Sequence, residues 1–247
     1  MRDANRRTAI GQTDPLPALA AVGSSPEREL EDAIAASLLA RIPPDALVPA
    51  LDEAFRVEVP ASVTIFRGDQ TVGISLVLRG VFRIFVVGDA GRQLTVGYAR
   101  VGDLLGIPSL VGGPVGLHVQ AITDAGMLRL PMARLATLFQ TDLGVAHLFC
   151  AELHRLLSSF TRELTLHALG SLRQRVIHQL VERAEPTPHG FVAGRMSQQQ
   201  LADATGAARE SVGRLLRQLR DESLIAFTSD QVVINDLERL LKGDQEP

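Results

Sequence analysis

The chain contains few of the residues that build disulfide frameworks and aromatic cores, and it has no long apolar run. Its 247 residues include a single cysteine, Cys150, no tryptophan, and 4% aromatic residues. One cysteine excludes an intramolecular disulfide framework and a cysteine-rich zinc or iron–sulfur site. Hydrophobic residues make up 46% of the chain, so Leu, Val, Ile and Ala must fill its cores. No apolar run reaches the roughly 18 residues that a transmembrane helix needs, and we expect no membrane span.

The N-terminal segment lacks the apolar core of a secretion signal. Its first residues include arginines, but the polar segment 11–15, with Gly11 and Pro15 at its ends, prevents a continuous apolar run after them. We therefore expect a cytoplasmic protein. Residues 1–25 are rich in Pro, Gly, Ser and Ala, which is typical of a mobile tail. The remaining length suits two domains of ordinary size.

The stretch from Met196 to Glu222 carries the signals of two short helices joined by a glycine turn. Ser197 has the side chain of an N-cap, and Gln200, three residues on, completes a capping box. Gly206 is placed to end the first helix, because glycine tolerates a positive φ. The expected second helix covers 207–221 and has apolar residues at helical spacing, namely Val212, Leu215, Leu216 and Leu219. This pattern predicts a helix-turn-helix.

The second helix also carries the chemistry for contacting base edges. In a helix-turn-helix the N-terminal residues of the second helix meet the bases, and here they are Arg209, Glu210 and Arg214. Arg pairs bidentately with guanine, and Glu accepts from cytosine N4. Residues 207–220 hold four arginines and one glutamate, although the whole chain has a net charge of −3. The short polar residues suited to phosphate oxygens are Ser197, Gln199 and Ser211.

A plainer interpretation is a solvated amphipathic helix in an ordinary bundle. The cap, the glycine turn and the Arg-Glu-x-x-x-Arg series occur together, however, and this combination favours DNA binding.

The region before this motif predicts a β-sandwich or jelly roll. Residues 27–40 and 46–53 suggest short helices. Between 55 and 130 the apolar residues then alternate in short segments divided by glycine-rich turns, including 68–69, 88–91 and 112–114. Strands that recur at such spacing are typical of a roll of antiparallel strands.

A long helix is expected after the strands, with Asp142 as its N-cap. It carries an apolar stripe close to a heptad pattern, which predicts a dimer interface of Phe149, Leu153, Leu156, Phe160 and Leu164. The alternative is that this stripe only packs on the β-roll of its own chain. A further helix is expected at 171–184, followed by a linker at 185–188.

Four segments in two regions of the chain together identify a resemblance. The sequence QQLADATGAARESVGRLLRQLRDESLI resembles the DNA-binding domain of the CRP/FNR transcription factor family. IFRGDQTVGISLVLRGVFRIF, GDLLGIPSL and HVQAITDAGMLRLP resemble the family's cyclic-nucleotide-binding β-roll. The resemblance spans roughly residues 30–245. It implies an α+β fold with an N-terminal β-roll (26–140), a dimerisation helix (141–170) and a C-terminal winged helix-turn-helix (171–247).

The resemblance also implies a function. A homodimer would contact a palindromic, TGTGA-like DNA site through Arg209, Glu210 and Arg214 and would act on RNA polymerase. The segment 227–233 resembles the wing strands of the family, and the segment 235–240 resembles its final short helix.

The expected effector pocket departs from that of the cyclic-AMP receptors. In those proteins an Arg-Ser pair neutralises the phosphate, and the matching positions here are Val115 and Gly116. Residues 102–119 contain no Arg or Lys, and burying a phosphate without a cation is costly. We therefore predict that cyclic AMP is not bound in the usual way. The pocket is expected to involve Gly102, Asp103, Leu104, Val115, Gly116, Phe160 and Thr161.

Several effectors stay open. One is an apolar or aromatic molecule held between the 104–117 segment and the long helix. Another is haem, with candidate ligands His118, His147, Cys150 and His154. The chain could also lack an effector, or sense redox state through Cys150, which has no evident resolving partner. No other cofactor and no metal site is indicated.

Functions of other classes are weaker. An enzyme on the β-roll is disfavoured, because the strand region holds only His118 as a metal-ligand histidine. A signalling subunit that controls a protein partner through the β-roll is the better alternative, but it would not need Arg209, Glu210 and Arg214.

Overall fold

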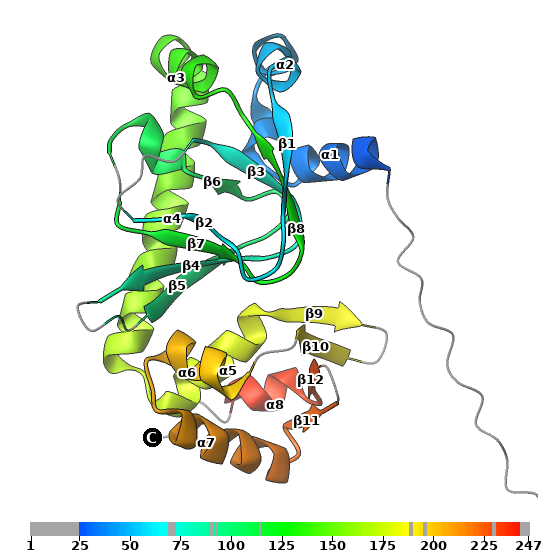
Figure 1. The fold of residues 1–247 in the computed structure, drawn as a ribbon, viewed down its shortest axis with the longest axis vertical. Coiled ribbons are helices and arrows are strands. Elements are labelled where there is room, and N and C mark those ends of the chain that lie inside the picture. Colours follow the sequence, from blue (N-terminus) through cyan, green and yellow to red (C-terminus); the bar gives the residue numbers. More distant parts are fainter. Residues whose placement is uncertain are drawn as a thin grey trace, which may run out of the picture.

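The computed structural model describes residues 25–68, 73–88, 91, 93–113, 115–187, 190–194, 197–228 and 231–242. They form a β-roll with flanking helices, one long helix, and a smaller C-terminal domain of helices around its own sheet (Figure 1). This is the predicted α+β architecture. The expected mobile tail, apart from its last residue, lies outside the described residues. So do parts of the expected turns at 68–69, 88–91 and 112–114.

The β-roll consists of two four-stranded antiparallel sheets with strand orders β1-β8-β3-β6 and β2-β7-β4-β5. Residues such as Val77, Phe82 and Met127 fill the space between the sheets. Strands β3 and β8 are buried at four of their five positions, so both of their faces are covered. The strands are β1 (Phe55–Val59), β2 (Thr64–Phe66), β3 (Ser75–Arg79), β4 (Phe82–Val87), β5 (Gln93–Ala99), β6 (Leu104–Leu105), β7 (His118–Ala121) and β8 (Ala125–Arg129).

Short helices cover the first sheet and form a second core that includes Leu39, Ile74 and Leu135. The expected helix at 27–40 is divided in two. Ser37 ends the first part, because its side chain accepts the backbone N–H of Leu39 at 3.0 Å and starts a new turn. The elements are α1 (Pro26–Ala35), the 3-10 turn η1 (Leu38–Arg41), α2 (Pro44–Asp52), a second 3-10 turn η2 (Ile107–Leu110) and α3 (Met132–Thr141).

The long helix α4 (Leu143–Leu169) runs along the β-roll toward the C-terminal domain (Figure 1). It begins at Asp142, whose side chain accepts the N–H of Val145 at 3.0 Å, as expected of an N-cap. The helix is 27 residues long, so it spans about 40 Å. It therefore connects the β-roll to the C-terminal domain.

The apolar stripe predicted as a dimer interface faces the chain's own β-roll. Phe149 is 0% exposed, Leu153 packs against the same core, and Leu156 and Phe160 line a cavity in the roll. The prediction is wrong for Phe149, because hydrophobic spacing alone does not say which neighbour covers a stripe. Leu153, Leu156 and Phe160 are only partly buried, and their place in a dimer interface stays a prediction. Of the five predicted residues, only Leu164 is exposed, at 56%.

A second stripe of α4 is exposed along its whole length. Its residues follow alternating spacings of four and three, which place them at the a and d positions of a heptad. Every one of them is exposed in the protomer. We call this set the α4 seam: Leu143, His147, Cys150, His154, Leu157, Thr161, Leu164 and Ala168.

The C-terminal domain packs its helices around a four-stranded sheet of order β11-β12-β10-β9. The expected linker at 185–188 is instead largely strand β9, because residues 184–187 pair with β10. The wing strands and the final helix occur near their expected positions. The elements are α5 (Leu172–Glu182), β9 (Ala184–Thr187), β10 (Gly190–Gly194), α6 (Gln198–Thr205), α7 (Arg209–Asp221), β11 (Ile225–Phe227), β12 (Gln231–Ile234) and α8 (Leu237–Lys242).

The C-terminal domain contacts β5 of the β-roll through α5 and α6 (Figure 1). The Tyr98 hydroxyl donates to the Gln179 side chain at 2.6 Å, and the Arg183 guanidinium lies 4.7 Å from the centre of the Tyr98 ring. Beside them, Arg83 is buried and donates to Thr95 and Gln93. Helices of the C-terminal domain thus pack directly on the sheet of the β-roll.

Candidate DNA-binding surface and effector pocket

Helix α6 begins and ends as the sequence predicts. The Ser197 side chain accepts the N–H of Gln200 at 3.1 Å, and the Gln200 side chain accepts the N–H of Ser197 at 2.8 Å. Both bonds of the capping box are therefore present. Gly206 ends the helix with a φ of 64°, a conformation that glycine adopts at little cost. These local bonds fix the angle at which the chain enters α7.

Helix α7 buries one face in the domain core and exposes the other. Val212, Leu215, Leu216 and Leu219 are buried, whereas Arg209, Glu210 and Arg214 are exposed. The helix lies at the outer edge of the C-terminal domain, on the side away from the β-roll (Figure 1). The three predicted base-contacting residues therefore share an accessible surface at the N-terminal half of this helix, as docking in a major groove requires.

Two residues that were not predicted to contact bases lie beside Glu210 and Arg214. Gln198, at the start of α6, and Arg217, on α7, line a shallow groove together with Glu210 and Arg214. Arg217 could have been found by its spacing, because it lies three residues after Arg214 on the same helix face. Gln198 belongs to a different helix, so only the folded turn brings it to the groove.

The predicted phosphate-contacting residues are placed near this surface but have partners of their own. Besides its cap bond, Ser197 is exposed. Gln199 donates to Asp203 at 2.8 Å, and the Ser211 hydroxyl accepts from Arg214 at 3.3 Å. The second of these contacts is made by Arg214, a predicted base-contacting residue, and it holds the Arg214 guanidinium against the helix.

The end of α7 is tied to α5 by an ion pair. Arg173 donates to Glu222 at 2.7 Å, and this hydrogen bond lowers the pKa of the Glu222 carboxyl. The C-terminal end of the helix is thereby anchored, while the N-terminal end is free to meet a ligand.

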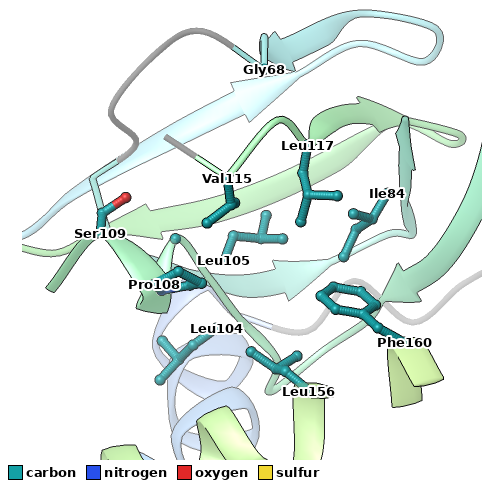
Figure 2. Close-up of a pocket in the computed structure, with 11 residues that line it drawn as sticks. Gly68, Ile84, Leu104, Leu105, Pro108, Ser109, Val115, Leu117, Leu156 and Phe160 are labelled. Atoms are coloured by element: carbon teal, nitrogen blue, oxygen red, sulfur yellow. The ribbon is translucent and has the colours of Figure 1, made fainter. Parts of the chain in front are cut away.

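The β-roll contains a small apolar cavity of about 70 Å³ against α4 (Figure 2). Ser109 supplies the one polar side chain among the described residues that line it, and none of these residues is basic. Figure 2 shows Leu156 and Phe160 pointing from α4 toward Ile84 and the strands. The lining residues are Gly68, Ile84, Leu104, Leu105, Gly106, Pro108, Ser109, Val115, Leu117, Leu156 and Phe160.

Only part of the predicted pocket set lines this cavity. Leu104, Val115 and Phe160 do so, whereas Gly116 and Thr161 do not. The hydroxyl of Thr161 donates to the backbone carbonyl of Leu157 within α4.

Gly102 and Asp103 line a different groove, next to the N-terminal helices. Gly102 has a φ of +89°, and a side chain there would meet Ala36 at 2.7 Å. The close contact with Ala36 explains the glycine without a ligand.

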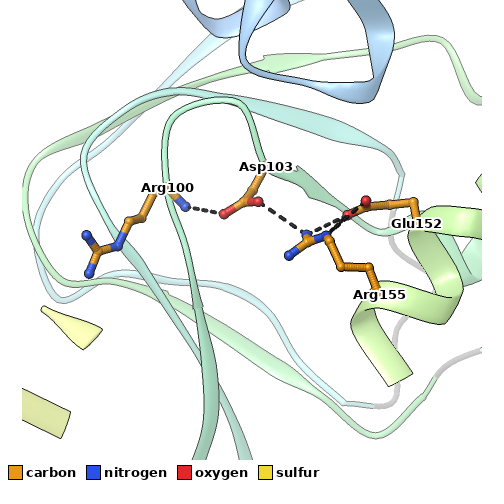
Figure 3. Close-up of polar contacts among 4 residues, drawn as sticks. All are labelled: Arg100, Asp103, Glu152 and Arg155. Carbon is orange, nitrogen blue, oxygen red and sulfur yellow. Dashed lines mark hydrogen bonds and ion pairs between the residues drawn. The ribbon is translucent and has the colours of Figure 1, made fainter. Parts of the chain in front are cut away.

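Asp103 is part of an ion-pair network between the roll and α4 (Figure 3). Its carboxylate accepts the backbone N–H of Arg100 at 2.9 Å and lies 3.3 Å from the Arg155 guanidinium, which also pairs with Glu152. Burial raises the pKa of the Asp103 carboxyl, against the opposing effects of the Arg100 N–H and of Arg155. This carboxylate, expected to line the effector pocket, holds the β5–β6 turn against α4.

None of the four candidate haem ligands lines the cavity. His118 stacks on Phe85, with 5.1 Å between the ring centres. His147, Cys150 and His154 lie on the α4 seam. Within the described part of one chain, no three metal-ligand side chains gather.

Two domain families match the chain. Residues 56–142 match the cyclic nucleotide-binding domain, and residues 174–242 match the Crp-like helix-turn-helix domain. The chain belongs to the CRP/FNR family of transcription regulators. Regulators of this family bind DNA and dimerise. The predicted fold class and the predicted function of a DNA-binding regulator are thereby confirmed.

This CRP/FNR regulator has relatives of similar length. It is 27% identical to the CRP-like protein Clp of Xanthomonas euvesicatoria over 203 residues, which cover 74% of this chain and 85% of the relative. The structure of the c-di-GMP-responsive global regulator CLP of Xanthomonas campestris superposes with a TM-score of 0.65 at 25% identity, over 78% of this chain and 100% of that one.

A further solved relative supports the fold alone. FixK2 of Bradyrhizobium japonicum superposes with a TM-score of 0.70 at 22% identity, over 78% of this chain and 98% of that one. None of the described helices of the CRP/FNR regulator has the length and hydropathy that crossing a membrane requires.

Proposed function

We propose that the regulator binds a palindromic TGTGA-like DNA site as a homodimer, with Arg209, Glu210 and Arg214 contacting base edges. The observation that carries this proposal is the exposure of these three side chains on α7, whose other face is buried. The two arginines offer paired donors to guanine, and Glu210 accepts from cytosine N4. The residues proposed to contact phosphate oxygens are Ser197, Gln199 and Ser211.

The dimer is proposed to form through the α4 seam. Each DNA-binding domain follows the C-terminal end of its α4, so two copies present both α7 helices to one duplex only if the α4 helices run parallel. A two-fold axis then places the recognition helices about one turn of DNA apart. The seam supports such a pairing with leucines at three of its four d positions, Leu143, Leu157 and Leu164.

The effector is proposed to be a small, uncharged and mainly apolar molecule in the β-roll cavity. A phosphate diester there would find no basic side chain among the described lining residues, and burying its charge unpaired is costly. Cyclic AMP is therefore not bound in the usual way. Because the cavity holds only about 70 Å³, a larger ligand must displace some of the side chains that line it, and these include Leu156 and Phe160 of α4. Its binding is thereby coupled to α4 and to the dimer.

A regulator is favoured over an enzyme or a signalling subunit because neither of those needs an exposed Arg-Glu-x-x-x-Arg surface on a helix-turn-helix. The site of action is then the DNA of the cytoplasm, and RNA polymerase is the proposed protein partner. The relative from Xanthomonas campestris responds to c-di-GMP, so this dianionic nucleotide belongs among the ligands to be tested.

The test is fluorescence anisotropy with a labelled palindromic TGTGA-type duplex. A duplex with both half-sites scrambled is the matched control. Each duplex is titrated with the full chain alone, with cyclic AMP and with c-di-GMP. We expect the palindrome to bind more tightly than the control, and cyclic AMP to change neither affinity.

Two results would contradict different parts of the proposal, namely the DNA contacts and the effector pocket. Equal affinity for the two duplexes would refute the assignment of the base-contacting residues. Preference for the palindrome only in the presence of cyclic AMP would leave that assignment intact and refute the account of the pocket.

A further inference from the structure

The α4 seam is unusual in its N-terminal half. Heptad a and d positions are normally apolar, because they pack against the facing helix. Here three consecutive positions of the seam carry His147, Cys150 and His154, whereas the later d positions return to Leu157 and Leu164. A polar residue at one such position can fix the register of a coiled coil, but three in succession weaken it. Their chemistry therefore needs another explanation.

All three side chains are exposed in the protomer. None of them has a hydrogen bond or an ion pair with another described residue. They contribute nothing visible to the fold of one chain. Thiolate and imidazole are, however, the ligands that zinc prefers in structural sites.

One protomer cannot supply a complete site. Among the described residues of a single chain, no three metal-ligand side chains gather. In a parallel two-fold pair, each seam position meets the same position of the second copy. Cys150 and His154 of both copies then provide two thiolates and two imidazoles, which is the Cys₂His₂ set of a closed tetrahedral zinc site.

His154 suits this role better than His147. Both lie within one turn of Cys150, but helical side chains lean toward the N-terminus. The ring of His154 therefore leans back over Cys150, whereas the ring of His147 leans away from it. The distinction provides an internal control, because two histidines that are both exposed on the same stripe are expected to behave differently.

We propose that two copies of α4 bind one zinc ion at the dimer axis through Cys150 and His154 of each copy. The two thiols lose their protons to solvent as the ion binds, and the ion crosslinks the seam where it lacks apolar contacts. Metal binding therefore stabilises the dimer. The inference rests on the proposed α4 dimer and is independent of the β-roll effector.

The experiment uses the full chain, reduced and metal-free, with Co²⁺ as the spectroscopic probe for zinc. Tetrahedral thiolate coordination gives visible d–d bands and a near-ultraviolet sulfur charge-transfer band. We expect both to saturate at one ion per two chains. Cys150→Ser should abolish the charge-transfer band, and His154→Gln should abolish the tetrahedral bands. His147→Gln, the matched control, should keep both.

Sedimentation of the same samples supplies a second readout. Zinc should lower the dimer dissociation constant of the wild type and of His147→Gln by about tenfold or more, and should leave that of Cys150→Ser unchanged. The proposal is overturned if the wild-type dimer shows no tetrahedral spectrum, if one ion binds per chain, or if His154→Gln binds like the wild type. A wild type that stays monomeric with zinc overturns it as well. DNA binding by a metal-free dimer would show that the proposed function survives such a failure.

Discussion

Alanine substitutions in the two apolar stripes of α4 should have different effects, one on the stability of the protomer and the other on dimerisation. Phe149 is 0% exposed in the protomer core, so Phe149→Ala should lower the free energy of unfolding by about 3–5 kcal/mol. Leu157 is 64% exposed, so Leu157→Ala should leave the stability of the protomer nearly unchanged. Its effect should fall on the dimer, because the second copy is what buries it.

The size of the dimer effect follows from the exposure of Leu157. Full burial of a leucine side chain contributes about 1.5–3 kcal/mol, and 64% of Leu157 remains to be covered. Each chain therefore contributes about 1–2 kcal/mol and the dimer about twice that amount. Leu157→Ala should weaken dimerisation between about thirtyfold and several hundredfold.

Two measurements separate the stripes. Sedimentation equilibrium gives the dimer dissociation constant of each variant, and urea unfolding at a concentration where the wild type is monomeric gives the protomer stability. If Leu157→Ala dimerises like the wild type while Phe149→Ala dissociates without losing stability, the assignment of the two stripes is reversed and the α4 seam is not the interface.

Three further changes test other parts of the structure. Arg209→Ala should weaken specific DNA binding by about 1–3 kcal/mol at the guanine that Arg209 contacts. Arg220→Ala, at the far end of α7, is the control. Retained site preference in Arg209→Ala would contradict the assignment of Arg209 as a base-contacting residue. Gly206→Ala should destabilise the protein by about 1–2 kcal/mol in urea unfolding because of its positive φ, whereas Gly206→Asn should cost less, and equal stability of all three proteins would refute the strain. Burial acts to lower the pKa of His178, but its hydrogen bond with Glu163 and the charge of that carboxylate outweigh this and raise it. The protonated His178 therefore stabilises the folded protein at pH values below the pKa that this histidine has in the unfolded chain. This stabilisation is lost as the pH rises through the pKa of His178 in the folded protein. Glu163→Gln should lower the pKa of His178 in an NMR titration and should remove the wild type's stability advantage at low pH only; an unchanged pKa would contradict the coupling.

The parts of the fold that the sequence predicts correctly depend on local bonds. The capping box of Ser197 and Gln200, the positive φ of Gly206 and the N-cap of Asp142 each involve residues at most three positions apart. Such signals are complete within a short stretch of chain, so no knowledge of the tertiary structure is needed to interpret them.

Sequence-based expectations are wrong where a distant segment decides the outcome. The stripe of Phe149 has almost the same period as the seam, and only the position of the β-roll shows which one is buried. Residues 185–188 contain two prolines and suggest a linker, but pairing with β10 makes 184–187 a strand. The turn sequence at Asp103 predicts a ligand contact, but it does not reveal that Arg155, 52 residues away in the chain, pairs with this carboxylate.

The buried Arg83 bears on how easily the two domains separate. One of its guanidinium nitrogens is enclosed and has no hydrogen-bond partner among the described residues, and burial lowers the pKa of this side chain. Separating α6 from β5 would return that nitrogen to water and recover its hydration. This gain offsets part of the free energy lost when the hydrogen bond between Tyr98 and Gln179 breaks. The packed and separated arrangements are thereby brought closer in free energy. A ligand that prefers one of them by only a few kcal/mol can then invert their populations.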